Sequence, residues 1–247
     1  MLSIGRHPVS GRERRASADA RALELALRLG GDTVHAIHAG DPDQPALRDY
    51  LGMGLPRLSV VPMPEDHDPV PALIACLQEL KPTLILAGLR GERGLDTGLL
   101  PHKVADALDF AMVPGIIDLS VTDGTATVTQ VLPKAGRRSV AAPLPLLATV
   151  HPGAPVPRAC AYARARRGHI ERIAIPTAQD PVLSSVQRAA WRPRPKALAP
   201  TGGSARDRLA RATVAKAGAG RIMIDPDPHD AARAILAELE EHGLLRK

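Results

Sequence analysis

Hydrophobic positions in the first 110 residues alternate between two spacings. Short runs rich in apolar and β-branched residues have the length of buried strands, and between them apolar residues such as Leu23, Ala26 and Leu27 recur at helical spacing. Ser17 is available as the N-cap of the first helix. The predicted strands are 33–40, 57–63 and 83–88, and the predicted helices are 16–31, 43–54, 68–81 and 99–110. This alternation predicts right-handed βαβ units and a parallel sheet.

The next stretch of the chain has a different pattern. Residues 112–150 alternate threonine and valine around a turn at Asp123 and Gly124. This pattern predicts a hairpin followed by another strand of the same domain. We therefore predict an α/β domain over residues 1–176, in which a mainly parallel sheet is sandwiched by helices.

The C-terminal part is poorer in regular patterns. Residues 191–207 are rich in proline and glycine, which predicts an extended linker. Residues 222–245 predict a short strand-like piece and an amphipathic helix that Asp227 caps. We therefore expect an extended C-terminal arm over 177–247 that ends in a helix.

The loop LRGERGLDTGLLP, at 89–101, follows a predicted buried strand and precedes a predicted helix. In parallel sheets, ligands bind beyond the carboxyl ends of the strands, where this loop lies. Its triplet Asp96–Thr97–Gly98 resembles that of aspartic proteases, but those enzymes need two such carboxylates in an all-β frame. The loop lacks the Walker A and GxGxxG patterns, although its glycines would allow a phosphate to approach the backbone. A nucleotide loop and an ordinary solvated loop both remain open on this pattern.

Composition and charge restrict the classes of partner that the protein could bind. The 247 residues are 45% hydrophobic but only 2% aromatic, and 32 Lys and Arg against 26 Asp and Glu give a net charge of +6. Basic residues cluster at 12–15 and 164–167. Without interleaved aromatic residues for base stacking, nucleic-acid binding is the weaker interpretation. A solvated face or a surface that docks acidic proteins is favoured.

Patterns typical of covalent catalysis are missing from the sequence. The nine histidines lack metal-ligand spacing, no GxSxG elbow is found, and no general acid–base pair stands out. Cys76 and Cys160 stand far apart, and we find neither a signal peptide nor an apolar stretch that could span a membrane. These features predict a cytoplasmic protein that is not itself an enzyme and that has no metal site.

Four stretches, taken in order, resemble the β subunit of electron transfer flavoproteins. They are ADARALELALRLGG, ALRDYLGMGLPRLSVV, the loop after TLILAG, and PLPLLATVHPGAPVPRACAYARARR. The resemblance covers residues 3–175 and, more weakly, the C-terminal helix. It implies a domain like the adenine nucleotide alpha hydrolases, in a heterodimer with an α subunit that carries FAD.

The resemblance also implies a role in electron transport. The β subunit of this family usually holds a structural AMP, while some relatives carry a second FAD in the same pocket; we expect AMP here. A flavin dehydrogenase would dock on the β subunit as electron donor, and a quinone oxidoreductase would be the acceptor. The C-terminal arm would reach across to the α subunit.

Nucleotide contacts carried over from the family fall mainly on the ends of the predicted strands and on the loop that follows 83–88. They are Ser3, Asp19, Ala39, Gly88, Asp96, Thr97 and Gly98. The chain departs from the family at several of the neighbouring positions: the first strand and the loop are short, the family's Asn-Pro is Ala16–Ser17, and Leu99 replaces a glutamine.

The family's partner-docking loop places an apolar anchor shortly after a Pro-Arg pair. Tyr162 holds that place here, and the alternative is a tyrosine that packs on its own domain. The predicted docking residues are Pro157, Arg158, Tyr162, Arg164, Arg166 and Arg167. The rival to the family function is a stand-alone nucleotide-binding protein of the same superfamily, either stress-protein-like or ATP-hydrolysing.

Overall fold

The computed structural model describes residues 1–7, 9–92, 97–185, 204, 206 and 223–241. The chain divides into two units, Met1–Arg194 and Pro195–Lys247. In these described parts, no helix combines the length and the apolar character that crossing a membrane requires.

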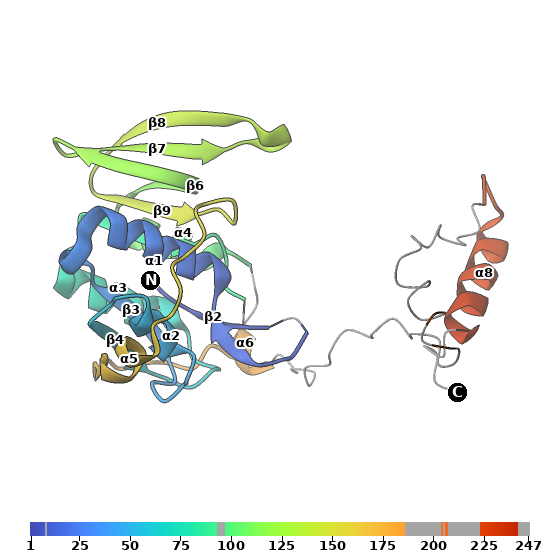
Figure 1. Ribbon diagram of the computed structural model, residues 1–247, viewed down its shortest axis with the longest axis horizontal. Helices are drawn as coiled ribbons and strands as arrows, with labels where there is room; N and C mark the ends of the chain where they lie inside the picture. The colour runs from blue at the N-terminus through green and yellow to red at the C-terminus, as the bar shows by residue number, and fades with distance from the viewer. Residues whose placement is uncertain (8, 93–96, 186–203, 205, 207–222, 242–247) are drawn as a thin grey trace. The chain divides into compact units, whose positions relative to one another are not determined.

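Strands in the first unit form a three-stranded and a five-stranded sheet plus a two-stranded ribbon (Figure 1). The three-stranded sheet is parallel and has the order β10 (His169–Arg172), β4 (Arg57–Pro62), β3 (Ala36–Gly40). The five-stranded sheet has the order β5 (Leu84–Gly88), β9 (Leu146–Val150), β6 (Ala111–Thr122), β7 (Thr125–Val131), β8 (Arg137–Pro143). The ribbon pairs β1 (Ile4–Arg6) with β2 (Glu13–Arg15).

The first two residues connect the two larger sheets. The amide of Leu2 donates to the Ile37 carbonyl of β3 at 2.9 Å, and the amino group of Met1 donates to the Leu86 carbonyl of β5 at 2.7 Å. Strands β3 and β5 therefore flank the start of the chain.

Helices cover both faces of β5 and β9. The helices of the first unit are α1 (Ser17–Gly30), α2 (Leu47–Gly52), α3 (Pro69–Leu80), α4 (Leu99–Ala107), α5 (Tyr162–Arg167) and α6 (Pro181–Ser185), with 3₁₀ turns at Gly31–Thr33 and Pro133–Ala135. Neighbouring residues of one strand face opposite ways: Leu86 and Leu146 belong to the core under α1, whereas Ile85 and Leu147 belong to the core under α3 and α4. Strands buried on both faces explain the continuous apolar runs in the sequence.

The α/β class is confirmed, with one strand more than expected at 112–150. Strands β6 and β7 form the predicted hairpin, and both of its turn residues, Asp123 and Gly124, have positive φ, at 48° and 74°. Strand β8 then adds an antiparallel edge before β9 turns back to pair in parallel with both β5 and β6. The edge strand was missed because only Ala142 of β8 is buried, so its apolar pattern is weak.

The second unit contributes helix α8 (Pro228–Glu241). The Asp227 side chain accepts a hydrogen bond from the amide of His229 at 2.9 Å, which confirms the predicted cap. Apart from residues 204 and 206, the expected linker at 191–207 lies outside the described residues.

Candidate functional site

A pocket of about 400 Å³ opens beyond the carboxyl ends of β3, β4 and β5. The predicted nucleotide residues Ser3, Asp19, Ala39, Gly88, Thr97 and Gly98 all line it. Asp96 lies outside the described residues. The structure thus brings together six positions that are spread over the first hundred residues of the chain.

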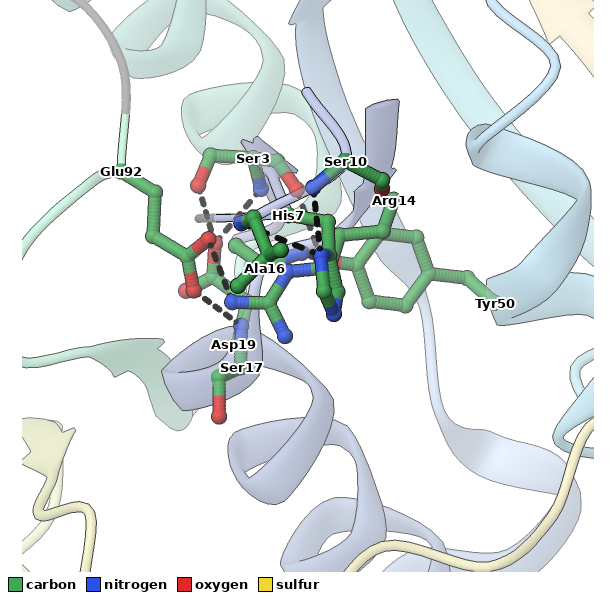
Figure 2. Close-up of polar contacts among 10 residues, drawn as sticks. Ser3, His7, Ser10, Arg14, Ala16, Ser17, Asp19, Tyr50 and Glu92 are labelled. Carbon is green, nitrogen blue, oxygen red and sulfur yellow. Dashed lines mark hydrogen bonds and ion pairs between the residues drawn. The ribbon is translucent and has the colours of Figure 1, made fainter. Parts of the chain in front are cut away.

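Asp19, in the first turn of α1, bonds to Ser3 near the start of the chain and to Gly88 at the end of β5, and Figure 2 shows its contact with Ser3. One carboxylate oxygen accepts hydrogen bonds from the amide and the hydroxyl of Ser3, at 2.7 and 2.5 Å, and the other accepts from the amide of Gly88 at 2.6 Å. The residue is 5% exposed, and burial raises the pKa of its carboxyl against the opposing effect of these hydrogen bonds. Asp19 is therefore a structural brace, because its hydrogen bonds hold the start of the chain and the end of β5 against α1.

Gly88 is needed for this brace because nothing larger fits. A Cβ atom at this position would lie 2.5 Å from the Asp19 carboxylate oxygen and 2.8 Å from the Cβ of Ala18. The glycine therefore allows the end of β5 to approach the first turn of α1 closely enough for the amide to reach Asp19.

Tyr50 is a second brace, which sequence reasoning did not identify. Its ring is fully buried, and its hydroxyl donates to the Ser3 carbonyl at 2.7 Å and accepts from the amide of Ala16 at 2.9 Å. Burial raises the pKa of this phenol well above its usual value. The only signal in the sequence is a tyrosine among the leucines of α2, where a hydroxyl is buried only if it finds partners.

Replacing Tyr50 with phenylalanine is expected to lower the free energy of unfolding by about 1–3 kcal/mol, because the amide of Ala16 keeps only a long contact to the Ser3 carbonyl, at 3.5 Å, in the interior. Urea unfolding of the purified protein measures this change. The matched control is Tyr162→Phe, which removes the same hydroxyl from a residue that is 74% exposed. Equal effects of the two substitutions would contradict the assignment.

The N-terminus of α1 is capped differently from the prediction. Ser17 is the first helical residue rather than the cap, and Ala16, at the N-cap position, has no side chain that can accept. Instead, Glu92 of the loop after β5 accepts from the amide of Ser17 at 2.6 Å and pairs with Arg14 at 3.2 Å (Figure 2). A carboxylate complements the positive end of a helix dipole. Capping rules consider only residues next to the helix, so they do not identify Glu92.

The loop between β5 and α4 also lines the pocket. Gly98 has φ of 71° and occupies the N-cap position of α4, and the Thr97 hydroxyl oxygen accepts from the amide of Leu99 at 3.2 Å. Lys103 lines the pocket one turn further along α4. The start of α4 therefore presents a helix N-terminus and a cation to the same space.

The residues predicted to dock a partner lie on a separate surface. Tyr162 begins α5 and is 74% exposed, with the Arg166 guanidinium 5.9 Å from its ring centre, so the ring does not pack into its own domain. Arg164, Arg166 and Arg167 are exposed, whereas Arg158 pairs with Glu24 of α1 at 2.8 Å. Pro157 is half-buried next to it. Among the described residues, no group of three or more His, Cys, Asp and Glu could hold a metal ion.

Comparison with known proteins agrees with this architecture. The family model of the electron transfer flavoprotein domain matches residues 11–178. The chain is 42% identical over 252 aligned residues to electron transfer flavoprotein subunit beta of Chromohalobacter salexigens, an alignment that covers 100% of this chain and 94% of that protein. The chain therefore belongs to the electron transfer flavoprotein β subunit family.

Proposed function

We propose that this β subunit is the scaffold and docking half of an electron transfer flavoprotein. It pairs with an α subunit that carries the redox-active FAD, receives a docked flavin dehydrogenase, and thereby passes electrons toward a quinone oxidoreductase in the cell. The observation that carries the proposal is an exposed tyrosine beside three exposed arginines, at 162–167, on a surface distinct from the pocket. An aromatic ring next to arginines is the usual composition of a binding hot spot.

AMP is the occupant that the pocket's residues favour. Its volume of about 400 Å³ falls within the range of small-ligand sites. The first turn of α4, Thr97 and Lys103 would hold one phosphate, and the apolar Val70, Leu73 and Leu100 would hold the base. AMP would act structurally, since binding to the folded state alone stabilises that state.

Negative charge at the same pocket argues against a larger nucleotide. Five carboxyl groups line it, those of Asp19, Asp41, Glu65, Asp68 and Asp180. Each further phosphate of ATP or FAD would add negative charge near these side chains. One phosphate satisfies the single lysine and helix N-terminus, which favours AMP over FAD in this chain.

The test is to purify the complex made with its α subunit, denature it, and identify the released nucleotides. We expect a yellow heterodimer that releases AMP and FAD in equal amounts. Release of FAD without AMP would show that the β pocket holds a second flavin or nothing. A colourless lone chain that turns over ATP would favour the stand-alone nucleotide-binding protein instead.

Replacing Tyr162 with alanine is expected to raise the KM for the flavin dehydrogenase about 30-fold, because a hot-spot aromatic is worth about 2 kcal/mol of binding. The AMP content should stay unchanged, since Tyr162 does not line the pocket. Steady-state reduction of the heterodimer measures the effect. Tyr162→Phe keeps the ring and should remain close to wild type; an unchanged KM in the alanine variant would refute the docking assignment.

A further inference from the structure

The segment between β9 and α5 has no helix or strand of its own, yet it is attached firmly to α1. Glu24, in the middle of α1, accepts from the amide of Arg158 at 3.0 Å and from its guanidinium at 2.8 and 3.3 Å. Arg28, one turn further on, donates to the same carboxylate at 2.8 Å. A single side chain therefore binds both the backbone and the side chain of the segment.

Further contacts hold the segment on either side of Arg158. Arg21 of α1 donates to the carbonyl of the buried Ala154, and Arg15 donates to the Arg158 carbonyl at 3.3 Å. The amide of Ala161 donates to the Gly52 carbonyl of α2 at 2.9 Å. The residues that precede Tyr162 are therefore held in place by α1, Arg15 and α2.

The charge of Glu24 is the central element of this attachment. The residue is 4% exposed, and burial by itself would raise the pKa of its carboxyl. Hydrogen bonds from Arg158 and Arg28 outweigh burial and lower the pKa to about 2, so the side chain is ionised at neutral pH. The Arg158 side chain is 41% exposed, so the pair contributes little to stability, but its hydrogen bonds join the segment to α1 at one defined point.

We infer that Glu24 is a positioning residue for docking: it fixes residues 154–161 on α1 and so presents Tyr162 and the α5 arginines in the geometry that the partner binds. The inference rests on the proposed function, in which this surface receives a flavin dehydrogenase. A loop that becomes ordered only on binding loses conformational entropy, which lowers the affinity for the partner. A segment that is already ordered in the free protein does not lose this entropy on binding.

This arrangement also assigns different roles to the basic residues. The Arg158 guanidinium is neutralised by Glu24 and belongs to the support rather than to the contact surface. Arg164, Arg166 and Arg167 have exposed side chains that remain available to a partner. The partner surface should therefore combine an apolar pocket for the tyrosine ring with carboxylates around it.

The experiment uses the intact heterodimer, with Glu24→Gln and Arg158→Met as two independent ways to break the pair. Glu171→Gln is the matched control, because Glu171 also pairs with an arginine, Arg57 at 3.4 Å, but the two side chains, 43% and 65% exposed, lie on the surface. Hydrogen exchange of residues 154–161 reports the attachment. KM and kcat are measured with the flavin dehydrogenase that reduces the wild-type complex.

In both variants we expect exchange at 154–161 to be at least about tenfold faster and KM to be raised several-fold, with kcat unchanged, because the docked geometry is the same once formed. The double variant should be no worse than either single variant. Unchanged exchange, or faster exchange without a change in KM, would overturn the inference.

The Tyr162→Ala variant separates this inference from the proposed function. If that variant raises KM and Glu24→Gln does not, the docking surface stands and the positioning role of Glu24 is wrong. If neither variant changes KM, the docking surface itself is wrong and the inference is overturned with it.

Discussion

Replacing Asp19 with alanine should produce the largest loss of stability of any single substitution near the pocket, about 3–5 kcal/mol, together with loss of the nucleotide. The amides of Ser3 and Gly88 both donate to this carboxylate, and the substitution would leave both without an acceptor, the Gly88 amide in a buried position and the Ser3 amide in a half-buried one. Each unsatisfied buried group costs about 1–3 kcal/mol. Urea unfolding gives the stability, and analysis of the denatured heterodimer gives the AMP content.

Two further variants separate the brace from a general effect of charge. Asp19→Asn keeps one acceptor oxygen but turns an amide donor toward either Ser3 or Gly88, so its loss of stability should be intermediate. Asp106→Ala removes a carboxylate from an exposed position of α4 and should change stability by less than about 0.5 kcal/mol. A stable Asp19→Ala variant that retains AMP would refute the bracing role.

Gly88→Ala is expected to destabilise the protein by about 1–3 kcal/mol and to abolish the rise in Tm that added AMP gives the wild type. The new methyl would meet the Asp19 oxygen at 2.5 Å, the Ala18 Cβ at 2.8 Å and the Asp19 amide nitrogen at 3.0 Å. Relief requires β5 and α1 to move apart, which breaks the hydrogen bond from the Gly88 amide.

The matched glycine is Gly136, in the connection before β8. It has φ of −62°, and a Cβ there would have its nearest neighbours at 3.4 Å. Gly136→Ala should therefore be neutral or slightly stabilising. The Tm of both variants is measured with and without AMP. If AMP raises the Tm of the two variants equally, the close approach at Gly88 is not required for AMP binding.

Elements with strong local patterns were predictable from the sequence. The helix expected at 68–81 is α3, Pro69–Leu80, because Asp68 caps it and leucines repeat along one side. The strand expected at 83–88 is β5, Leu84–Gly88, because a short apolar run is what a strand buried on both faces requires. In each case the signal lies within a few residues of the element itself.

Contacts between distant residues were not predictable from one sequence. Glu92 caps α1 from 75 positions away, and Glu24 holds Arg158 from 134 positions away. The residues of the pocket were found through resemblance to a family, which identifies positions but not partners. That Asp19 bonds to Ser3 and Gly88 became visible only when β5 and α1 were placed side by side.

The strand order β5-β9-β6 has a consequence for how the chain is made. On the ribosome, β5 and β6 emerge well before Leu146, yet β5 lacks its ladder partner, and β6 its second one, until residues 146–150 are available. The antiparallel strands β6, β7 and β8 can pair as soon as they appear, because their contacts are local. Until β9 inserts, the nascent chain exposes an unpaired apolar strand edge at β5, and this is the interval in which it is most open to aggregation.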